Sequence, residues 1–182
     1  MRHHFCIDPG HGGRDSGAVY RGLAEAWIAL RVAILMRPLL LDLGHTVTLT
    51  RENDVYVPLV QRAKTANKAG AHGFLSVHCN ADQDDDGPGT SEARGSEIWV
   101  AKNSGLQIAD ALRPALETRL LGEHFRGIKQ APFTVLTHTA MPAALVEIGF
   151  IDCSDTARRL SDMNVLSDVA EGLVTGLIKA AS

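Results

Sequence analysis

Short apolar segments alternate with longer segments of helical periodicity along most of this 182-residue chain. We predict strands at 3–7, 45–50, 73–77, 96–101 and 143–148, shorter strands at 126–129 and 134–136, and helices at 24–43, 59–69, 104–121 and 165–180. This alternation is typical of a mostly parallel central sheet with helices on both faces. With 45% hydrophobic residues, the chain is long enough to bury one core. We therefore predict a single three-layer α/β domain over residues 1–182.

The first long helix carries many apolar residues, and its buried face has to be chosen from their spacing. Trp27, Leu30, Ile34 and Leu41 recur at intervals that place them on one side of a helix, and Gly44 follows as a stop signal. We predict that these four side chains face the core.

Charge and cysteine usage exclude several functions. The net charge of −3 offers no positive field for nucleic acid. The apolar stretch 27–43 is interrupted by charged residues and is too short to span a bilayer, so we predict no membrane insertion. The three cysteines are widely spaced and predict packed, reduced thiols. The N-terminus lacks the apolar core of an export signal, which predicts synthesis in the cytoplasm.

Two histidines follow predicted strands. His11 lies in the turn 8–13, among glycines that leave space around an imidazole, and His78 follows the apolar strand 73–77. Sites in open α/β sheets form at the carboxyl ends of strands, where these histidines can converge on a metal ion. His11, in its turn, is also compatible with a solvated loop position. Strand alternation points Cys79 away from His78, toward the core.

Two glutamates are candidates for the same site. Glu147 lies inside an apolar strand, where an unpaired charge is costly, so it is either paired with an arginine or kept as a general base. Glu25 opens the first long helix, where a carboxylate complements the helix dipole or serves as a metal ligand. The residues alone leave both questions open.

The remaining polar features predict less. The acidic segment 82–87 resembles the start of a calcium-binding loop but lacks its final glutamate, so a solvated loop bordering the substrate groove is the favoured interpretation. No spacing predicts a second metal site among the other histidines. We expect these to be structural or exposed: His3, His4, His45, His72, His124 and His138.

Several motifs, in order, resemble the zinc-dependent N-acetylmuramoyl-L-alanine amidases of the Amidase_3 type. They are Ile7 to Gly13, Gly22-Leu23 with Glu25, Leu49 to Arg51 with Asp54, Leu59, Arg62, Ala66 and Asn67, Ser76 to Asn80, and Val146 to Ile151. The resemblance implies a hydrolase that cuts peptidoglycan between the lactyl group of N-acetylmuramic acid and L-alanine. It also implies one zinc ion per chain, held by His11, Glu25 and His78, and Glu147 as the catalytic base. Two histidines, a carboxylate and an open position form a typical catalytic zinc site.

Three further matches are expected to be structural. Arg51, Asp54 and Arg62 are predicted to form surface ion pairs between helix and loop. Asp8 is compatible with orienting His11 or with forming the turn, and we leave it out of the site.

Two other functions stay open beside the amidase. One is a peptidoglycan-binding module without turnover, and the other is a zinc peptidase that cuts within the stem peptide. For the amidase, the missing export signal and the lack of an added wall-binding domain fit a phage or prophage endolysin, made in the cytoplasm and acting on peptidoglycan in the periplasm or cell wall after release. A catalytic domain excised from a longer secreted enzyme would explain both absences equally. Peptidoglycan is the expected partner, and a monomer is the favoured state.

Overall fold

The computed structural model describes residues 1–82, 93–118 and 124–182. A six-stranded sheet has the order β4-β1-β5-β8-β6-β7. Its strands are β1 His4–Pro9, β4 Thr46–Leu49, β5 Gly73–Asn80, β6 Ser96–Val100, β7 Phe125–Gln130 and β8 Ala143–Phe150. The pairs β4/β1, β1/β5, β5/β8 and β6/β7 are parallel, and only β6/β8 is antiparallel. The predicted α/β class with a mostly parallel sheet is confirmed.

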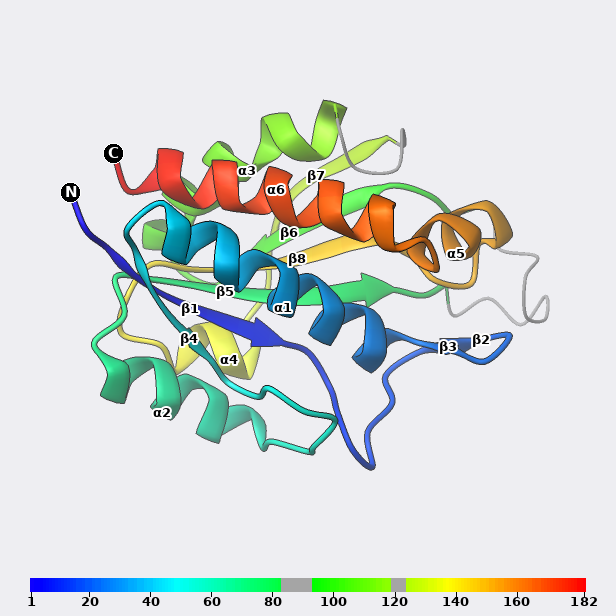
Figure 1. Ribbon diagram of the computed structural model, residues 1–182, viewed down its shortest axis with the longest axis horizontal. Helices are drawn as coiled ribbons and strands as arrows, with labels where there is room; N and C mark the ends of the chain where they lie inside the picture. The colour runs from blue at the N-terminus through cyan, green and yellow to red at the C-terminus, as the bar shows by residue number, and fades with distance from the viewer. Residues whose placement is uncertain (83–92, 119–123) are drawn as a thin grey trace.

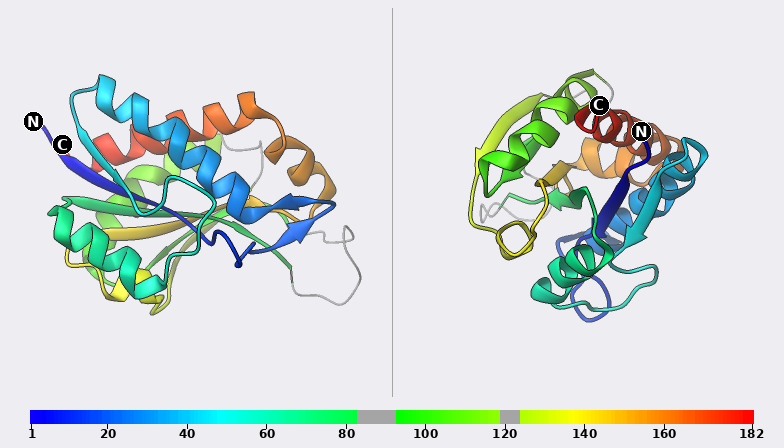
Figure 2. Two further views of the ribbon diagram at one scale, coloured as in Figure 1. Left: turned by 60° about the horizontal axis from the view of Figure 1, so that its bottom comes forward. Right: turned by 90° about the vertical axis from the view of Figure 1, so that its left-hand side faces the viewer.

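Helices cover both faces of this sheet (Figure 1). Helices α1, α3 and α6 lie on one face, and α2 and α4 lie on the other (Figures 1 and 2). The helices are α1 Glu25–Asp42, α2 Leu59–Ala69, α3 Leu106–Thr118, α4 Thr134–Thr137, α5 Ser154–Leu160 and α6 Met163–Ala180, with a short 3₁₀ turn η1 Asn103–Gly105. The two faces correspond to two clusters of buried apolar side chains, the larger one under α1, α3 and α6. This arrangement matches the predicted three layers.

The predicted buried face of α1 is wrong. Trp27 and Leu41 are 37% and 49% exposed. The residues of α1 that are wholly buried are Ile28, Ala29, Val32, Ala33, Met36 and Leu40. Because this helix is apolar on nearly every side, spacing alone did not distinguish its faces, and the small side chains of Ala29 and Ala33 mark the side that packs closely.

The predicted strand at 134–136 is a single helical turn, α4. The carbonyl of Phe133 accepts hydrogen bonds of 2.9 Å from the backbone N–H groups of Leu136 and Thr137, which closes the turn. Neighbouring residues in a strand point to opposite faces, whereas in this turn Val135 and Leu136 are both buried against the smaller core cluster. Burial of two adjacent apolar residues therefore overrides their β propensity.

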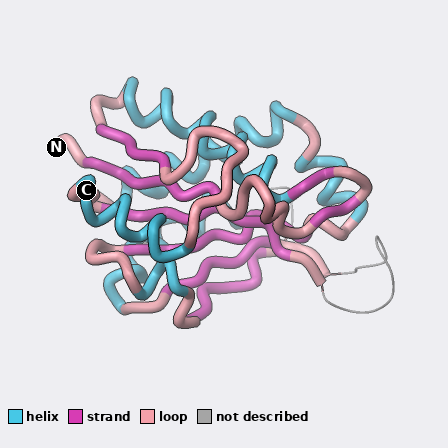
Figure 3. Tube along the Cα trace, turned by 90° about the horizontal axis from the view of Figure 1, so that it is seen from below, coloured by secondary structure: helices cyan, strands magenta, loops and turns pink. Residues whose placement is uncertain are grey.

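Two features that follow the carboxyl ends of β1 and β8 were not predicted. A small hairpin of β2 Val19–Tyr20 and β3 Leu23–Ala24 leads directly into α1, and α5 follows β8. Seen from below, the loops after β1 and β4 and the hairpin gather at the same end of the sheet (Figure 3). Both chain termini lie at the opposite end (Figure 1). The acidic segment predicted as a solvated loop falls, from residue 83 onward, outside the described residues.

Candidate active site

His11 lies in the turn that follows β1. Its backbone has φ 57°, an uncommon value for a residue other than glycine, which the surrounding hydrogen bonds maintain. Its Nδ1 lies 2.9 Å from Oδ1 of Asp15, and that carboxylate also accepts a hydrogen bond from the backbone N–H of Gly17. Asp15 therefore orients the imidazole and leaves Nε2 directed away from the turn.

Glu25 is brought to His11 by the β2/β3 hairpin. The backbone N–H of Glu25 donates to the carbonyl of Ala18, and its Oε2 accepts from the backbone N–H of Ala18 at 3.0 Å. Its Oε1 lies 3.1 Å from Nε2 of His11 and 2.9 Å from Nδ1 of His78. Its side-chain oxygens are bonded to Ala18, His78 and the N–H of Cys79, so the side chain points into the site, where Glu25 is 4% exposed.

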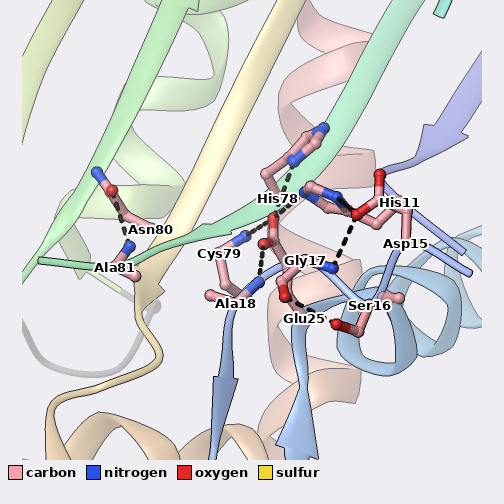
Figure 4. Close-up of polar contacts among 12 residues, drawn as sticks. His11, Asp15, Ser16, Gly17, Ala18, Glu25, His78, Cys79, Asn80 and Ala81 are labelled. Atoms are coloured by element: carbon pink, nitrogen blue, oxygen red, sulfur yellow. Dashed lines mark hydrogen bonds and ion pairs between the residues drawn. The ribbon is translucent and has the colours of Figure 1, made fainter. Parts of the chain in front are cut away.

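His78 completes a three-residue cluster at the end of β5 (Figure 4). One ligand atom from each of His11, Glu25 and His78 lies within 4.8 Å of the other two. Cys79, the next residue, is buried on the other side of the strand, as alternation predicts. The structure thus brings together three of the four residues singled out from the sequence as ligands or base.

Glu147 is the fourth, and it lies on β8 opposite His78 in the parallel β5/β8 pair. Its Oε2 is buried without a hydrogen-bond partner, and within the described residues none of its contacts is an ion pair with an arginine. Glu147, His11 and His78 line one cavity of about 300 Å³. A buried carboxylate oxygen with no partner is unusual and is typical of a functional group.

The electrostatics of the cluster follow from this packing. Burial acts to lower the pKa of His11, but the hydrogen bonds and charges of Glu25 and Asp15 outweigh it and raise that pKa to about 9. Burial acts to raise the pKa of Glu25, but hydrogen bonds from the two imidazoles hold it well below its usual range. Burial raises the pKa of Glu147 to about 7. One carboxylate is therefore a fixed anion and the other is suited to exchange protons near neutral pH.

The prediction of surface ion pairs for the two arginines is wrong. Arg51 and Arg62 are 3% and 2% exposed. Arg51 donates to the carbonyls of Pro9 and Gly10, and Arg62 donates to those of Pro9 and His11. They remain structural, but they act by satisfying the backbone of the turn that carries His11 from within the protein.

Asp54 and Asp8, which lie near this turn, have roles other than those predicted from the sequence. Asp54 accepts a hydrogen bond of 2.7 Å from the backbone N–H of Gly13. Asp8 is fully buried and is hydrogen-bonded to Arg62, Thr50 and Ser76, so it does not orient His11. Asp15, which does, was missed. The signal available in the sequence was that Asp15 lies four residues after His11, in a segment where the chain must reverse its direction.

The donor set fits a zinc ion. Two imidazole nitrogens and a carboxylate oxygen converge, and the second ring nitrogen of His11 is hydrogen-bonded to a carboxylate, as is usual for a metal-ligating histidine. The backbone also leaves room for a ligand ring: a Cβ atom added at Gly10 would lie 2.3 Å from Cε1 of His78. Such a donor set beside the buried carboxylate of Glu147 is chemically suited to metal-assisted hydrolysis.

Comparison with known proteins gives the family. The model of the family described as N-acetylmuramoyl-L-alanine amidase (Amidase_3) matches residues 5–179, so this chain belongs to that family. The resemblance and the enzyme class predicted from the sequence are thereby confirmed. AmiC2, an N-acetylmuramoyl-L-alanine amidase of Nostoc punctiforme, has a similar structure, with a TM-score of 0.89 and 32% identity over 97% of this chain and 95% of that one.

Sequence relatives include bacterial and phage proteins. The chain is 37% identical to the N-acetylmuramoyl-L-alanine amidase CwlM of Bacillus licheniformis, over 96% of this chain and 67% of that protein. It is 38% identical to the endolysin of Bacillus phage SPP1, over 94% of this chain and 63% of that protein. The chain thus spans about two thirds of the length of these relatives. Across the residues described, no helix is long and apolar enough to cross a bilayer.

Proposed function

We propose that this chain hydrolyses the amide bond between the lactyl group of N-acetylmuramic acid and the L-alanine of peptidoglycan, in a zinc-dependent reaction. The observation that carries the proposal is the convergence of His11, Glu25 and His78 beside the unpaired carboxylate of Glu147 in one cavity. Membership of the amidase family supports the choice of substrate.

His11, Glu25 and His78 would hold the zinc ion, one ion per chain. Zinc bound by such a set supplies Lewis acidity, which polarises a carbonyl and makes water more acidic. Asp15 would accept a hydrogen bond from Nδ1–H of His11, which keeps the proton on Nδ1 and leaves the lone pair of Nε2 for the metal. Glu25 has its second oxygen occupied by the N–H of Ala18, which fixes the direction of Oε1.

Glu147 moves the proton in this proposal. Its Oε2 takes a proton from the attacking water, and the hydroxide adds to the carbonyl carbon of the lactyl amide. The tetrahedral intermediate collapses as the C–N bond breaks, and Glu147 gives its proton to the leaving nitrogen of L-alanine. A pKa raised to about 7 by burial suits a group that must accept and then donate. The products are a lactyl carboxylate and a peptide with a free amine.

The test is digestion of purified peptidoglycan with analysis of the new ends by mass spectrometry. Zinc-loaded protein should release stem peptides with free L-alanine amines, and a chelator should stop the release. Glu147→Gln, which keeps the shape of the side chain but not its basicity, should lower kcat by at least about 100-fold. Glu52→Gln, an equal change at an exposed glutamate, should retain full activity.

The alternative functions appear as distinct results of that digestion. New amines within the stem peptide would identify a zinc peptidase. Retention of the zinc-loaded protein on peptidoglycan with no new ends would identify a binding module. Either result overturns the proposed amidase.

We propose further that the protein acts on cell-wall peptidoglycan as a lytic enzyme of the endolysin kind, and that it acts as a monomer. The similarity to a phage endolysin supports the first part. Expression together with a pore-forming holin should lyse a bacterial host, whereas the Glu147→Gln variant should not. Sedimentation analysis of the purified protein would check the second part, with a dimer mass as the contrary result.

A further inference from the structure

Two acidic side chains, Glu147 and Glu97, lie side by side on the sheet between the proposed zinc site and the edge strand β7. His78 on β5 is the register partner of Glu147 on β8, and Glu147 is in turn the register partner of Glu97 on β6. Directly opposite residues share a face of the sheet, and neighbouring strands lie about 4.8 Å apart. Glu97 therefore lies next to Glu147, one strand further from the metal ligands.

Glu97 is a buried anion with four donors. It is 2% exposed, and its Oε1 accepts hydrogen bonds from Nδ2 of Asn80 at 2.9 Å and Nε1 of Trp99 at 3.1 Å. Its Oε2 forms ion pairs with Nε of Arg126, at 3.1 Å, and with Nζ of Lys129. The carboxylate thus anchors two cations of the edge strand β7.

A bulge in β7 makes this double contact possible. Ser96 pairs with Phe125 and Ile98 pairs with Ile128, so two steps along β6 correspond to three along β7. In a regular strand, two residues three positions apart point to opposite faces. The extra residue lets Arg126 and Lys129 reach the same carboxylate, and Gly127, with φ 109°, supplies the backbone conformation. Bulges of this kind re-aim side chains next to active sites.

The side chains of Arg126 and Lys129 are partly exposed to solvent, and two positive charges face the single negative charge of Glu97. Arg126 and Lys129 side chains are 36% and 35% exposed. Among the described residues, Glu97 is the one carboxylate within ion-pair distance of either, so within that part of the chain the three side chains carry one excess positive charge. Such a surplus, fixed in place by a buried acid, is suited to an anionic ligand.

Lys129 is also connected to the proposed active-site cavity. Nζ of Lys129 lies 5.0 Å from the ring centroid of Trp99, and Trp99 packs edge-on against Phe133 with the ring centroids 5.4 Å apart. Phe133 lines the cavity that contains His11, His78 and Glu147. A ligand that extends from Glu147 past Phe133 would therefore reach Lys129.

We propose that Arg126 and Lys129 form a carboxylate-binding subsite for the peptide part of the substrate. This inference rests on the proposed amidase function for the nature of the ligand. Strand β7 lies two strands from β8, about 10 Å away, and two to three residues of extended peptide span about 7 to 10 Å. The subsite thus selects an acidic residue at the second or third position after the scissile amide.

The test measures binding of two synthetic stem peptides that start with a free L-alanine amine and carry no glycan. They differ only in whether the acidic residue has a free carboxylate or a primary amide. Calorimetry on the zinc-loaded protein should give about tenfold tighter binding of the free carboxylate, the size expected for hydrogen bonds to a charged group. Equal affinity for the two peptides would overturn the proposal.

Variants then assign the preference to these residues. Lys129→Gln and Arg126→Gln should each reduce the tenfold ratio to about threefold or less, whereas Lys129→Arg should retain it. Each single variant leaves Glu97 one cation, and unchanged thermal midpoints would verify folding. Arg113→Gln removes an equal charge from α3, on the opposite face of the sheet, and should leave the ratio unchanged. A ratio that survives in both Gln variants would refute the subsite.

Failure of the two proposals can be told apart, because these peptides contain no lactyl amide. If the protein binds the free carboxylate selectively but does not cleave peptidoglycan, the subsite stands and the amidase proposal fails. If it cleaves peptidoglycan but binds both peptides equally, only the subsite is refuted.

Discussion

Arg62 and Asp8 form an ion pair beneath the turn that carries His11, with Nη1 of the arginine 3.0 Å from Oδ1 of the aspartate. Both side chains are almost wholly buried. The same guanidinium donates to the carbonyl of His11, so α2 is connected through one side chain to the end of β1. The position of a proposed metal ligand therefore depends on a charge pair that lines the same cavity but supplies none of the proposed ligands.

Removal of the arginine should be strongly destabilising. Arg62→Leu leaves the Asp8 carboxylate buried without its counter-charge, which costs about 3 to 5 kcal/mol of unfolding free energy. Arg37→Leu breaks the exposed pair with Glu52 and should cost less than about 1 kcal/mol. Chemical denaturation of the metal-free proteins would measure both. Similar losses for the two variants would show that burial of the Arg62 pair is not decisive.

Asp15 should control metal affinity without being a ligand. Asp15→Asn keeps a hydrogen-bonding side chain at Nδ1 of His11 but removes its charge, and loss of such a partner lowers zinc affinity by about 10 to 100-fold. Competition with a chromogenic chelator would measure the change. Asp110→Asn, at an exposed position on α3, is the matched control. Wild-type affinity in Asp15→Asn would contradict the orienting role.

Gly10 should tolerate no side chain. A Cβ atom at this position would lie 2.3 to 2.6 Å from three atoms of the His78 ring, so Gly10→Ala must displace the imidazole. We expect loss of zinc binding, by at least about 100-fold, with the fold retained. Gly70→Ala is the control: it carries backbone strain at the end of α2, but its Cβ meets open space. Equal zinc affinity in both variants would be the contrary result in the same chelator assay.

His45 should make stability depend on pH. Burial, followed by the charges of His3 and the N-terminus, lowers the pKa of His45. The unfolded chain therefore binds a proton at higher pH than the native state does, and stability falls as pH decreases below about 6.5. His45→Asn retains an acceptor for the N–H of His3 but cannot be protonated, so this part of the pH dependence should disappear.

Urea denaturation at pH 7.5 and pH 5.5 would check this. The loss of unfolding free energy between the two pH values should be smaller in His45→Asn than in wild type. His124→Asn, at an exposed position, controls for removal of an imidazole. An unchanged loss in His45→Asn would rule out His45 as the source.

Periodicity was sufficient for a helix with one clear apolar side and for strands that are apolar throughout. Helix α2 has the predicted bounds, and the buried strands β5 and β8 were located correctly, although each continues a few residues further. It failed for α1, whose residues are apolar around most of the helix, and at Thr134–Thr137, where a short β-branched segment forms a helical turn. In both cases the buried face or the conformation depends on the surface against which the segment packs. A local sequence pattern contains no information about that surface.

The sequence by itself determined the α/β class, the motif residues His11, Glu25, His78 and Glu147, and the family, because these depend on residue type and order along the chain. Only the tertiary structure decided that Glu25 turns from the start of a helix toward two histidines, that Asp15 rather than Asp8 orients His11, and that Arg51 and Arg62 are buried. It also decided that a bulge at Gly127 places two cations on Glu97. The physical reason is that hydrogen-bond partners and burial arise between residues far apart in the chain, and their energies depend on distances that sequence spacing does not specify.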